Sequence, residues 1–208
     1  MKPTWNVVSA EGQKTFSVIF DTIGFFTRTT DDLQLIATAL GIKDDEKANV
    51  PPFKIRGARF AFVKSSAWAE VGPSTNAVLE AGIRLLREKG AQIEEVTLPP
   101  AFGNLSKWHT VIMCSDGQAA FYNEYLRSKE KLDEQIIEMV ENSDGYTRTA
   151  QLAAFDGIAS LRPQFDLIAN QYAAIITPSA VDEAPVGEKT GRAIFNTSWT
   201  VRKRRVLP

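Results

Sequence analysis

The stretch ARFAFVKSSAWAEVGPSTNAVLEAGIRLLREKGAQIEEVTL, residues 58–98, decides the fold. Residues 58–63 are apolar and aromatic enough to predict a buried strand, and residues 93–98 predict a second one. Between them Pro73 fits the first turn of a helix, apolar side chains recur at helical spacing, and Gly90 fits the helix end. A strand, a helix and a strand in this order predict a βαβ unit, whose two strands are parallel.

Helical periodicity also dominates the regions outside this unit. A helix is predicted to begin at Thr29 or Thr30, either of which fits an N-cap, and to end at Gly41. Residues 105–141 give a longer helical stretch that becomes increasingly charged, and residues 148–171 give another.

Two further strands and one helix break are expected. Residues 15–20 and residues 173–177 read as short strands, and Pro163 should kink or divide the helical stretch around it. With the βαβ unit, these elements predict an α/β fold with a mixed sheet and helices on both faces. No shift in composition indicates a second domain.

Composition narrows the class of protein. The chain has 208 residues, 44% hydrophobic and 24% charged, which is typical of a globular domain. A net charge of −1 argues against nucleic acid or a membrane surface as a partner. There is no apolar run of membrane-spanning length and no secretory segment, and the single Cys114 suits a reducing compartment, so we expect a cytoplasmic protein.

Two local groups imitate catalytic motifs. Lys64, Ser65 and Ser66 are adjacent, but neighbouring side chains on an extended chain point in opposite directions, so we expect only a polar strand end. His109 and Cys114 lie five residues apart, more than 90° around a helix, and we expect Cys114 to be a buried apolar residue. One histidine and one cysteine cannot supply the usual ligands of a metal site, so no metal is expected.

Several ordered stretches together resemble the amidase signature family of serine hydrolases. The resemblance runs from residue 2 to about residue 200, and the sequence motifs are most similar to those of fungal-type amidases. One departure is Asn6, which stands where many members have glycine. The stretches that carry the resemblance are KPTWNVVSAEG (2–12), FDTIGFFTRTTDDLQLIA (20–37), PSTNAVLEAGIRLLREKGAQIEEVTLP (73–99), IITPSAVDEAP (175–185) and GEKTGRAIFNTSWT (187–200).

The resemblance implies amide hydrolysis without a metal or organic cofactor. In the family a serine attacks the amide, a second serine in a cis peptide link relays the proton, and a neutral lysine accepts it. A glycine-rich segment supplies the oxyanion hole. All of these precede the Lys-Pro-Thr strand, so no catalytic residue can be assigned here. We therefore expect one partial amidase-like domain over residues 1–208 that lacks its N-terminal half, with an atypical basic tail at residues 201–208.

The best local motif is Asp21, Thr22 and Gly24. By its chemistry it is a turn in which the aspartate bonds backbone amides, and the resemblance implies structural support of the active-site floor. Two functions remain open. The chain is either an amidase-family protein that is inactive alone and meets a small-molecule amide only when the missing half is supplied, or a non-catalytic binding or scaffold protein. In both cases an exposed sheet surface could promote self-association.

Overall fold

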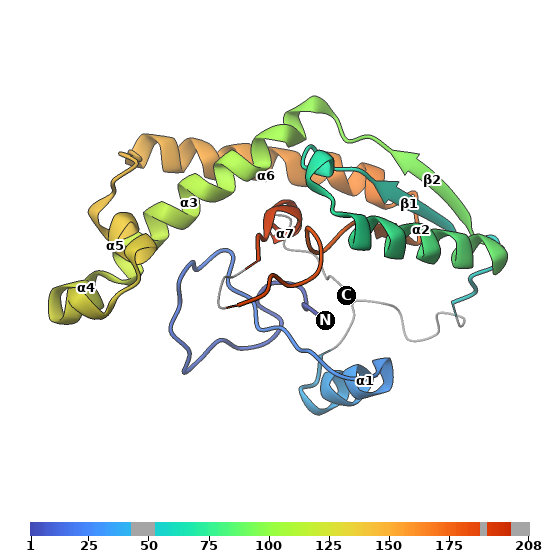
Figure 1. Ribbon diagram of the computed structural model, residues 1–208, viewed down its shortest axis with the longest axis horizontal. Coiled ribbons are helices and arrows are strands. Elements are labelled where there is room, and N and C mark those ends of the chain that lie inside the picture. Colours follow the sequence, from blue (N-terminus) through green and yellow to red (C-terminus); the bar gives the residue numbers. More distant parts are fainter. Residues whose placement is uncertain (43–52, 188–190, 201–208) are drawn as a thin grey trace. The chain divides into compact units, whose positions relative to one another are not determined.

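The computed structural model describes residues 1–42, 53–187 and 191–200. The basic tail, residues 201–208, lies outside the described residues. In chain order (Figure 1), the elements are α1 (Thr30–Ala39), β1 (Arg59–Val63), the 3₁₀ helix η1 (Trp68–Glu70), α2 (Pro73–Glu88), β2 (Gln92–Val96), η2 (Pro100–Asn104), α3 (Leu105–Ala120), α4 (Tyr122–Ser128), η3 (Lys129–Lys131), α5 (Glu134–Glu141), α6 (Arg148–Ala169), β3 (Ala174–Ile176) and α7 (Ile194–Thr200).

The chain divides into two compact units, each built from separate stretches of sequence. The sheet unit consists of residues 48–106 and 158–198. The helical unit consists of residues 1–47, 107–157 and 199–208. The long helices α3 and α6 contribute residues to both units. That the chain is one partial domain stays a prediction.

Three parallel strands in the order β2-β1-β3 form the sheet. β1 pairs with β2 beginning with Arg59 opposite Gln92, and with β3 beginning with Phe60 opposite Ala174. The βαβ prediction is confirmed, with α2 joining β1 to β2. The expectation of a mixed sheet is wrong for the described residues, because both pairings are parallel. Each connection between neighbouring strands contains a helix, which is long enough to return the chain to the same end of the sheet.

The central strand β1 is covered on both faces, as expected for a parallel sheet. On one face Ala61 and Val63 are fully buried, and on the other Phe60 is also buried. The helix α2 lies against the face of the sheet that carries Phe60, and Ile83 is the buried residue of this helix. The near absence of polar residues from this strand is thus explained by its place in the middle of the sheet.

A residue far along the chain caps the first turn of α2. Gly72 precedes the helix and has no side chain to cap it, so Asp182 supplies the carboxylate, whose Oδ1 accepts bonds from the backbone amides of Ser74 (3.1 Å) and Thr75 (3.3 Å). A Cβ atom on Gly72 would lie 2.1 Å from Asp182 Oδ2, so only glycine fits. The loop that follows β3 is therefore fixed against the start of α2.

Pro163 lies inside α6 and does not divide it, so of the two expected effects the division is wrong, and the kink stays a prediction. Ile158, Leu161 and Phe165 form a buried stripe on this part of the helix. Proline removes one backbone hydrogen bond, and burial of three large apolar side chains outweighs that loss.

The helix α1 begins and ends where the sequence predicts. Thr29 accepts a hydrogen bond from the amide of Asp32 at 3.1 Å, which is the geometry of an N-cap. Gly41, just beyond the helix, has φ of +62°, a left-handed conformation that favours glycine.

The strand predicted over residues 15–20 is wrong, because this segment forms turns. The amide of Phe20 donates to the carbonyl of Ser17 at 3.2 Å, which curls the backbone back on itself. The aromatic residues that suggested a strand serve the packing of the helical unit instead: Phe16 meets Phe121 edge to face, with ring centroids 5.1 Å apart.

Candidate functional site

Parallel strands place their carboxyl ends at one edge of the sheet, where α/β proteins usually bind ligands. In the sheet unit β1 ends at Val63 and β3 ends at Ile176. The hydroxyl of Thr177, directly after β3, donates to the carbonyl of Val63 at 3.3 Å. The segments that follow the two strands therefore lie side by side.

A hollow of about 160 Å³ lies in this region, and we call it the serine hollow. Four serines and one glutamate are among its lining residues, and side chains of these types can both donate and accept hydrogen bonds. An uncharged polar group such as a carboxamide matches this lining. Its residues come from the loop after β1 and η1, from the start of α3, and from α7: Ser65, Ser66, Ala67, Glu70, Ser106, Ile194 and Ser198.

Local bonds shape the wall of the serine hollow. Ser65 Oγ accepts from the amide of Ala67 at 3.3 Å, which turns the chain out of the strand direction and into η1. Glu70, the last residue of η1, forms an ion pair with Arg192. The carboxylate therefore has a cation beside it, and the loop is tied to the segment that leads into α7.

Lys64, Ser65 and Ser66 were expected to form only a polar strand end, and the structure gives the two serines and the lysine different surroundings. Both serines line the serine hollow, because the chain has left the extended conformation there. Lys64 is engaged elsewhere: its Nζ lies 2.9 Å from Glu95 and 5.2 Å from the ring centroid of Trp68. An ion-paired ammonium cannot accept a proton from a serine, so these three residues do not form a nucleophile with its base.

Asp21, Thr22 and Gly24 form a bonded loop in the helical unit. Asp21 Oδ2 accepts from the amide of Phe16 at 2.7 Å, as predicted for an aspartate in a turn, and Thr22 donates its hydroxyl to a carbonyl of the same loop at 3.3 Å. A Cβ on Gly24 would lie 3.4 Å from the carbonyl oxygen of Met1. The three residues thus stabilise the loop, and their role as an active-site floor stays a prediction.

A buried polar network in the helical unit was not predicted. Ser17 is fully buried and donates to Asp116 Oδ2 at 2.6 Å, and Gln151 donates to Asp116 Oδ1 at 2.9 Å. Gln151 in turn accepts from Arg148. Asp116 of α3 therefore holds the segment just before Asp21 and a turn of α6 at the same time.

His109 and Cys114 do not have the environment of a catalytic pair. His109 stacks on Phe20 with ring centroids 4.9 Å apart, and burial lowers its pKa, so it is a neutral packing residue. Burial, and then the charge of Asp144, raises the pKa of the Cys114 thiol. A thiol with a raised pKa is a weaker nucleophile, since the thiolate is the reactive form.

Metal-binding and membrane-spanning features are both missing from residues 1–42, 53–187 and 191–200. Within these ranges no three side chains of the metal-binding types gather into a possible site. In the same part of the chain, no helix has the length and apolar character needed to span a membrane.

The serine hollow shows what the sequence could not indicate. The rule that sites follow the carboxyl ends of parallel strands would have singled out Ser65 and Ser66. Ser106 and Ser198 carry no such signal, because they reach the hollow only through the packing of α3 and α7.

Residues 1–202 match the sequence profile of the amidase family. The chain belongs to the amidase family. The predicted resemblance is thereby confirmed at family level over almost the whole chain, while the narrower likeness to fungal-type amidases stays a prediction.

Curated relatives match parts of the chain. A glutamyl-tRNA(Gln) amidotransferase subunit from Gloeobacter violaceus is 34% identical over 131 residues, which cover 57% of this chain and 26% of the relative. The 2-amino-5-chloromuconic acid deaminase of Comamonas testosteroni is 28% identical over 144 residues, covering 67% of this chain and 30% of the relative.

Solved amidase structures show that the fold is shared. The corresponding glutamyl-tRNA(Gln) amidotransferase subunit from Thermotoga maritima matches with a TM-score of 0.74 and 20% identity, covering 97% of this chain and 48% of that one. A fatty acid amide hydrolase matches with a TM-score of 0.76 and 19% identity, covering 97% and 39%. The chain thus spans about half the length or less of these relatives, and its fold is a partial amidase-signature fold.

Proposed function

We propose that the chain contributes one wall of a carboxamide-binding site to an amidase, and that the 208-residue polypeptide does not hydrolyse amides by itself. The observation that carries the proposal is the serine hollow at the carboxyl ends of β1 and β3, in a chain that belongs to the amidase family. Its hydroxyls suit the carbonyl and N–H groups of an amide. Ile194 offers a small apolar surface for the acyl chain.

The chemistry of the residues at hand supports the proposed inactivity of the isolated polypeptide. Amide hydrolysis by the family mechanism needs a serine whose proton can pass to a neutral lysine. The lysine next to the hollow serines, Lys64, is ion-paired with Glu95. By the family resemblance, the nucleophile, the relay serine, the lysine and the oxyanion hole all belong to segments that precede the Lys-Pro-Thr strand.

The substrate class is a carboxamide with a short acyl group at this wall. A volume of about 160 Å³ holds only a few non-hydrogen atoms, so a larger substrate would extend beyond the hollow. The names of the relatives refer to a glutamyl-tRNA, to 2-amino-5-chloromuconic acid and to a fatty acid amide. The breadth of these names supports a general amide-binding wall rather than one acyl group.

An NMR titration tests this proposal. The ¹⁵N-labelled chain is titrated with butyramide, and the backbone signals of Ser65, Ser66 and Ser106 should shift together along one saturable curve. Ser66→Ala should weaken binding by about tenfold, because it removes one hydrogen bond to a neutral group. Ser143→Ala, an exposed serine in the helical unit, is the matched control and should change nothing.

Two results would contradict the proposal. Shifts scattered over the surface without saturation would mean that the serine hollow does not bind amides. Equal affinity of the parent chain and Ser66→Ala would mean that butyramide binds elsewhere.

A further inference from the structure

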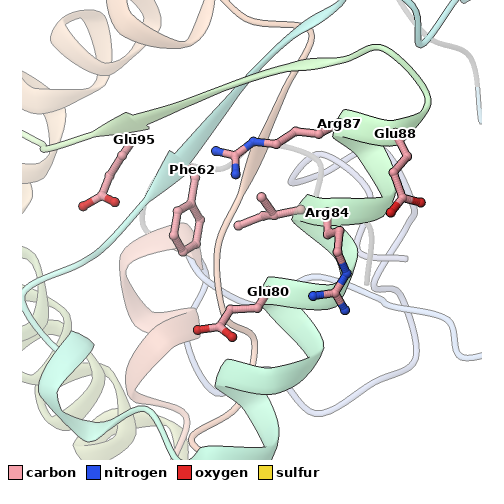
Figure 2. A pocket seen from close by; sticks show the side chains of 7 residues that line it. Phe62, Glu80, Arg84, Arg87, Glu88 and Glu95 are labelled. Carbon is pink, nitrogen blue, oxygen red and sulfur yellow. The ribbon is translucent and has the colours of Figure 1, made fainter.

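A second and larger hollow lies between α2 and the sheet, within the sheet unit. It encloses about 510 Å³ and shares no lining residue with the serine hollow. Phe62 of β1, labelled in Figure 2, and Ile83 of α2 are the two apolar residues that line it. Charged residues make up the rest of the lining: Glu80, Arg84, Arg87 and Glu88 from α2, and Glu95 from β2.

The register of the strands explains why the hollow is open. Phe60 stands opposite Ile93, and there is no hollow at this pair, because Phe60 is buried. Two residues further along the same face, Phe62 stands opposite Glu95, whose side chain is 56% exposed. A carboxylate in place of an apolar side chain cannot fill the space under α2, so Phe62 is left half-buried.

The charges that line this hollow balance, because Glu80 and Glu88 offset Arg84 and Arg87, and Lys64 offsets Glu95, so the direction of each arginine decides what it can bind. Glu95 is neutralised by Lys64 at 2.9 Å, and Glu80 accepts from Asn76 at 2.8 Å. Among the described residues, neither Arg84 nor Arg87 forms an ion pair.

The two guanidinium groups differ in direction. In Figure 2, Arg87 extends from α2 across the hollow toward Phe62, whereas the guanidinium of Arg84 lies along the helix, away from Phe62. Arg87 is therefore the group placed to meet a ligand that rests on Phe62.

We propose that this hollow binds a small carboxylate with a flat or short apolar body. The carboxylate pairs with Arg87, whose planar guanidinium suits two parallel hydrogen bonds to the two oxygens. The apolar body lies on Phe62 and Ile83 and displaces water from them. The volume falls within the range of known small-molecule sites. This site is independent of amide hydrolysis and of the serine hollow.

The test uses phenylacetate as the probe, followed by calorimetry and by the NMR signals of Phe62 and Arg87. We expect saturable binding with a Kd of about 1 mM or tighter. Arg87→Gln should weaken it by about tenfold or more, since it removes the charged partner and keeps much of the side chain. Phenylacetamide, which has the same shape without the charge, should bind about tenfold more weakly at these signals.

Matched variants keep the outcome clear. Arg84→Gln removes an equal charge from the same helix and should change the Kd by no more than about twofold. Ser66→Ala, in the serine hollow, should leave phenylacetate binding unchanged, which separates this proposal from the proposed function. Equal loss in Arg84→Gln and Arg87→Gln, equal affinity for acid and amide, or no saturation would each overturn it. Circular dichroism of each variant confirms the fold.

Discussion

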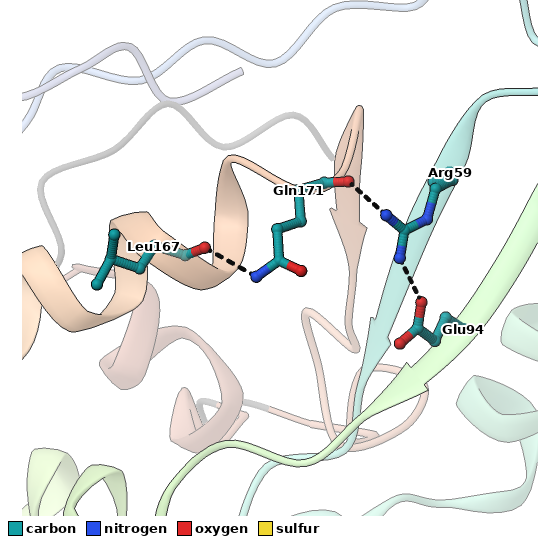
Figure 3. A network of polar contacts seen from close by, with 4 residues as sticks. All are labelled: Arg59, Glu94, Leu167 and Gln171. Atoms are coloured by element: carbon teal, nitrogen blue, oxygen red, sulfur yellow. Dashed lines mark hydrogen bonds and ion pairs between the residues drawn. The ribbon is translucent and has the colours of Figure 1, made fainter.

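The two units of this chain hold their distant segments together in different ways. In the sheet unit the side-chain network of Arg59 lies at the surface: Arg59 of β1 donates to Glu94 of β2 at 2.8 Å and to the carbonyl of Gln171, just before β3 (Figure 3). In the helical unit the corresponding links are buried, from Ser17 to Asp116 and from Gln151 to Asp116. The sheet unit also has a ladder of backbone hydrogen bonds, which the first 29 residues of the helical unit lack.

The difference indicates where each unit is vulnerable. An exposed ion pair contributes little to stability, because water solvates both charges when the pair is broken. A buried polar group that loses its partner has no water to replace it, so its loss is costly. We therefore expect side-chain changes to affect the helical unit more than comparable changes affect the sheet unit.

The largest effect is expected from Gly157→Ala in the helical unit. A Cβ atom at this position in α6 would lie 2.6 Å from the ring of Trp108 in α3, so either the ring or the helix must shift. We expect a loss of about 3 kcal/mol in the free energy of unfolding, measured in urea. The control is Gly82→Ala on α2 of the sheet unit, where a Cβ meets nothing within 4 Å and should stabilise the helix by about 0.5–1 kcal/mol. Destabilisation of the same size in both variants would contradict the comparison.

Ser17→Ala should have the next largest effect. The substitution removes the buried Ser17 hydroxyl, which donates a hydrogen bond of 2.6 Å to Asp116 Oδ2. The expected loss is about 2 kcal/mol, measured by urea unfolding. Hydrogen exchange should also speed up around Phe16 and Asp21, whose mutual bond depends on this segment. If exchange there stays as slow as in the parent chain, Asp116 does not position the loop.

Asn6 offers a smaller and two-sided test. Its φ of +64° is left-handed, a conformation that glycine adopts without strain, and this fits the glycine that the family resemblance implies at this position. Asn6→Ala should cost about 1 kcal/mol, because a Cβ without a compensating polar group disfavours this conformation. Asn6→Gly should leave the unfolding midpoint unchanged or raise it slightly. The reverse order of the two variants would show that the backbone at residue 6 is not strained.

The smallest effect belongs to the exposed pair of the sheet unit. Glu94→Gln should leave the unfolding midpoint unchanged at neutral pH. The hydrogen bond from Arg59, with a further one from Tyr172, lowers the pKa of Glu94 below its ordinary 4.5. Any stabilisation from this carboxylate is therefore present above pH 4.5 and is lost as the pH falls through the lowered value.

An NMR titration of the Glu94 carboxyl checks this directly. Arg59→Gln should raise the pKa of Glu94 toward 4.5, because the first of the two donors is weakened. An unchanged titration curve would mean that the pair is not formed in solution.

The sequence predicted those elements whose cause is local. Residues 58–63 were predicted as a strand and β1 is Arg59–Val63, because a run of apolar residues between turn signals can be read without its partners. Residues 15–20 have the same β-forming composition but form turns, since Ser17 bonds Asp116, which is 99 residues away. No local pattern contains that information.

The candidate site was predictable to a similar degree. The polar residues after β1 could be noticed in the sequence, and Asp21 was correctly predicted to bond a backbone amide. The assembly of the serine hollow from three distant segments depends on tertiary packing. The hollow above Phe62 likewise depends on strand register, which places Glu95 opposite an aromatic residue.

Whether the polypeptide is inactive alone is decided by its reaction with a fluorophosphonate, together with ammonia release from butyramide and benzamide. We predict no ammonia above the buffer rate and no labelled serine from the purified 208 residues, because Lys64, the lysine beside the hollow serines, is ion-paired with Glu95. Turnover of either amide together with stoichiometric labelling of a single serine would contradict this prediction.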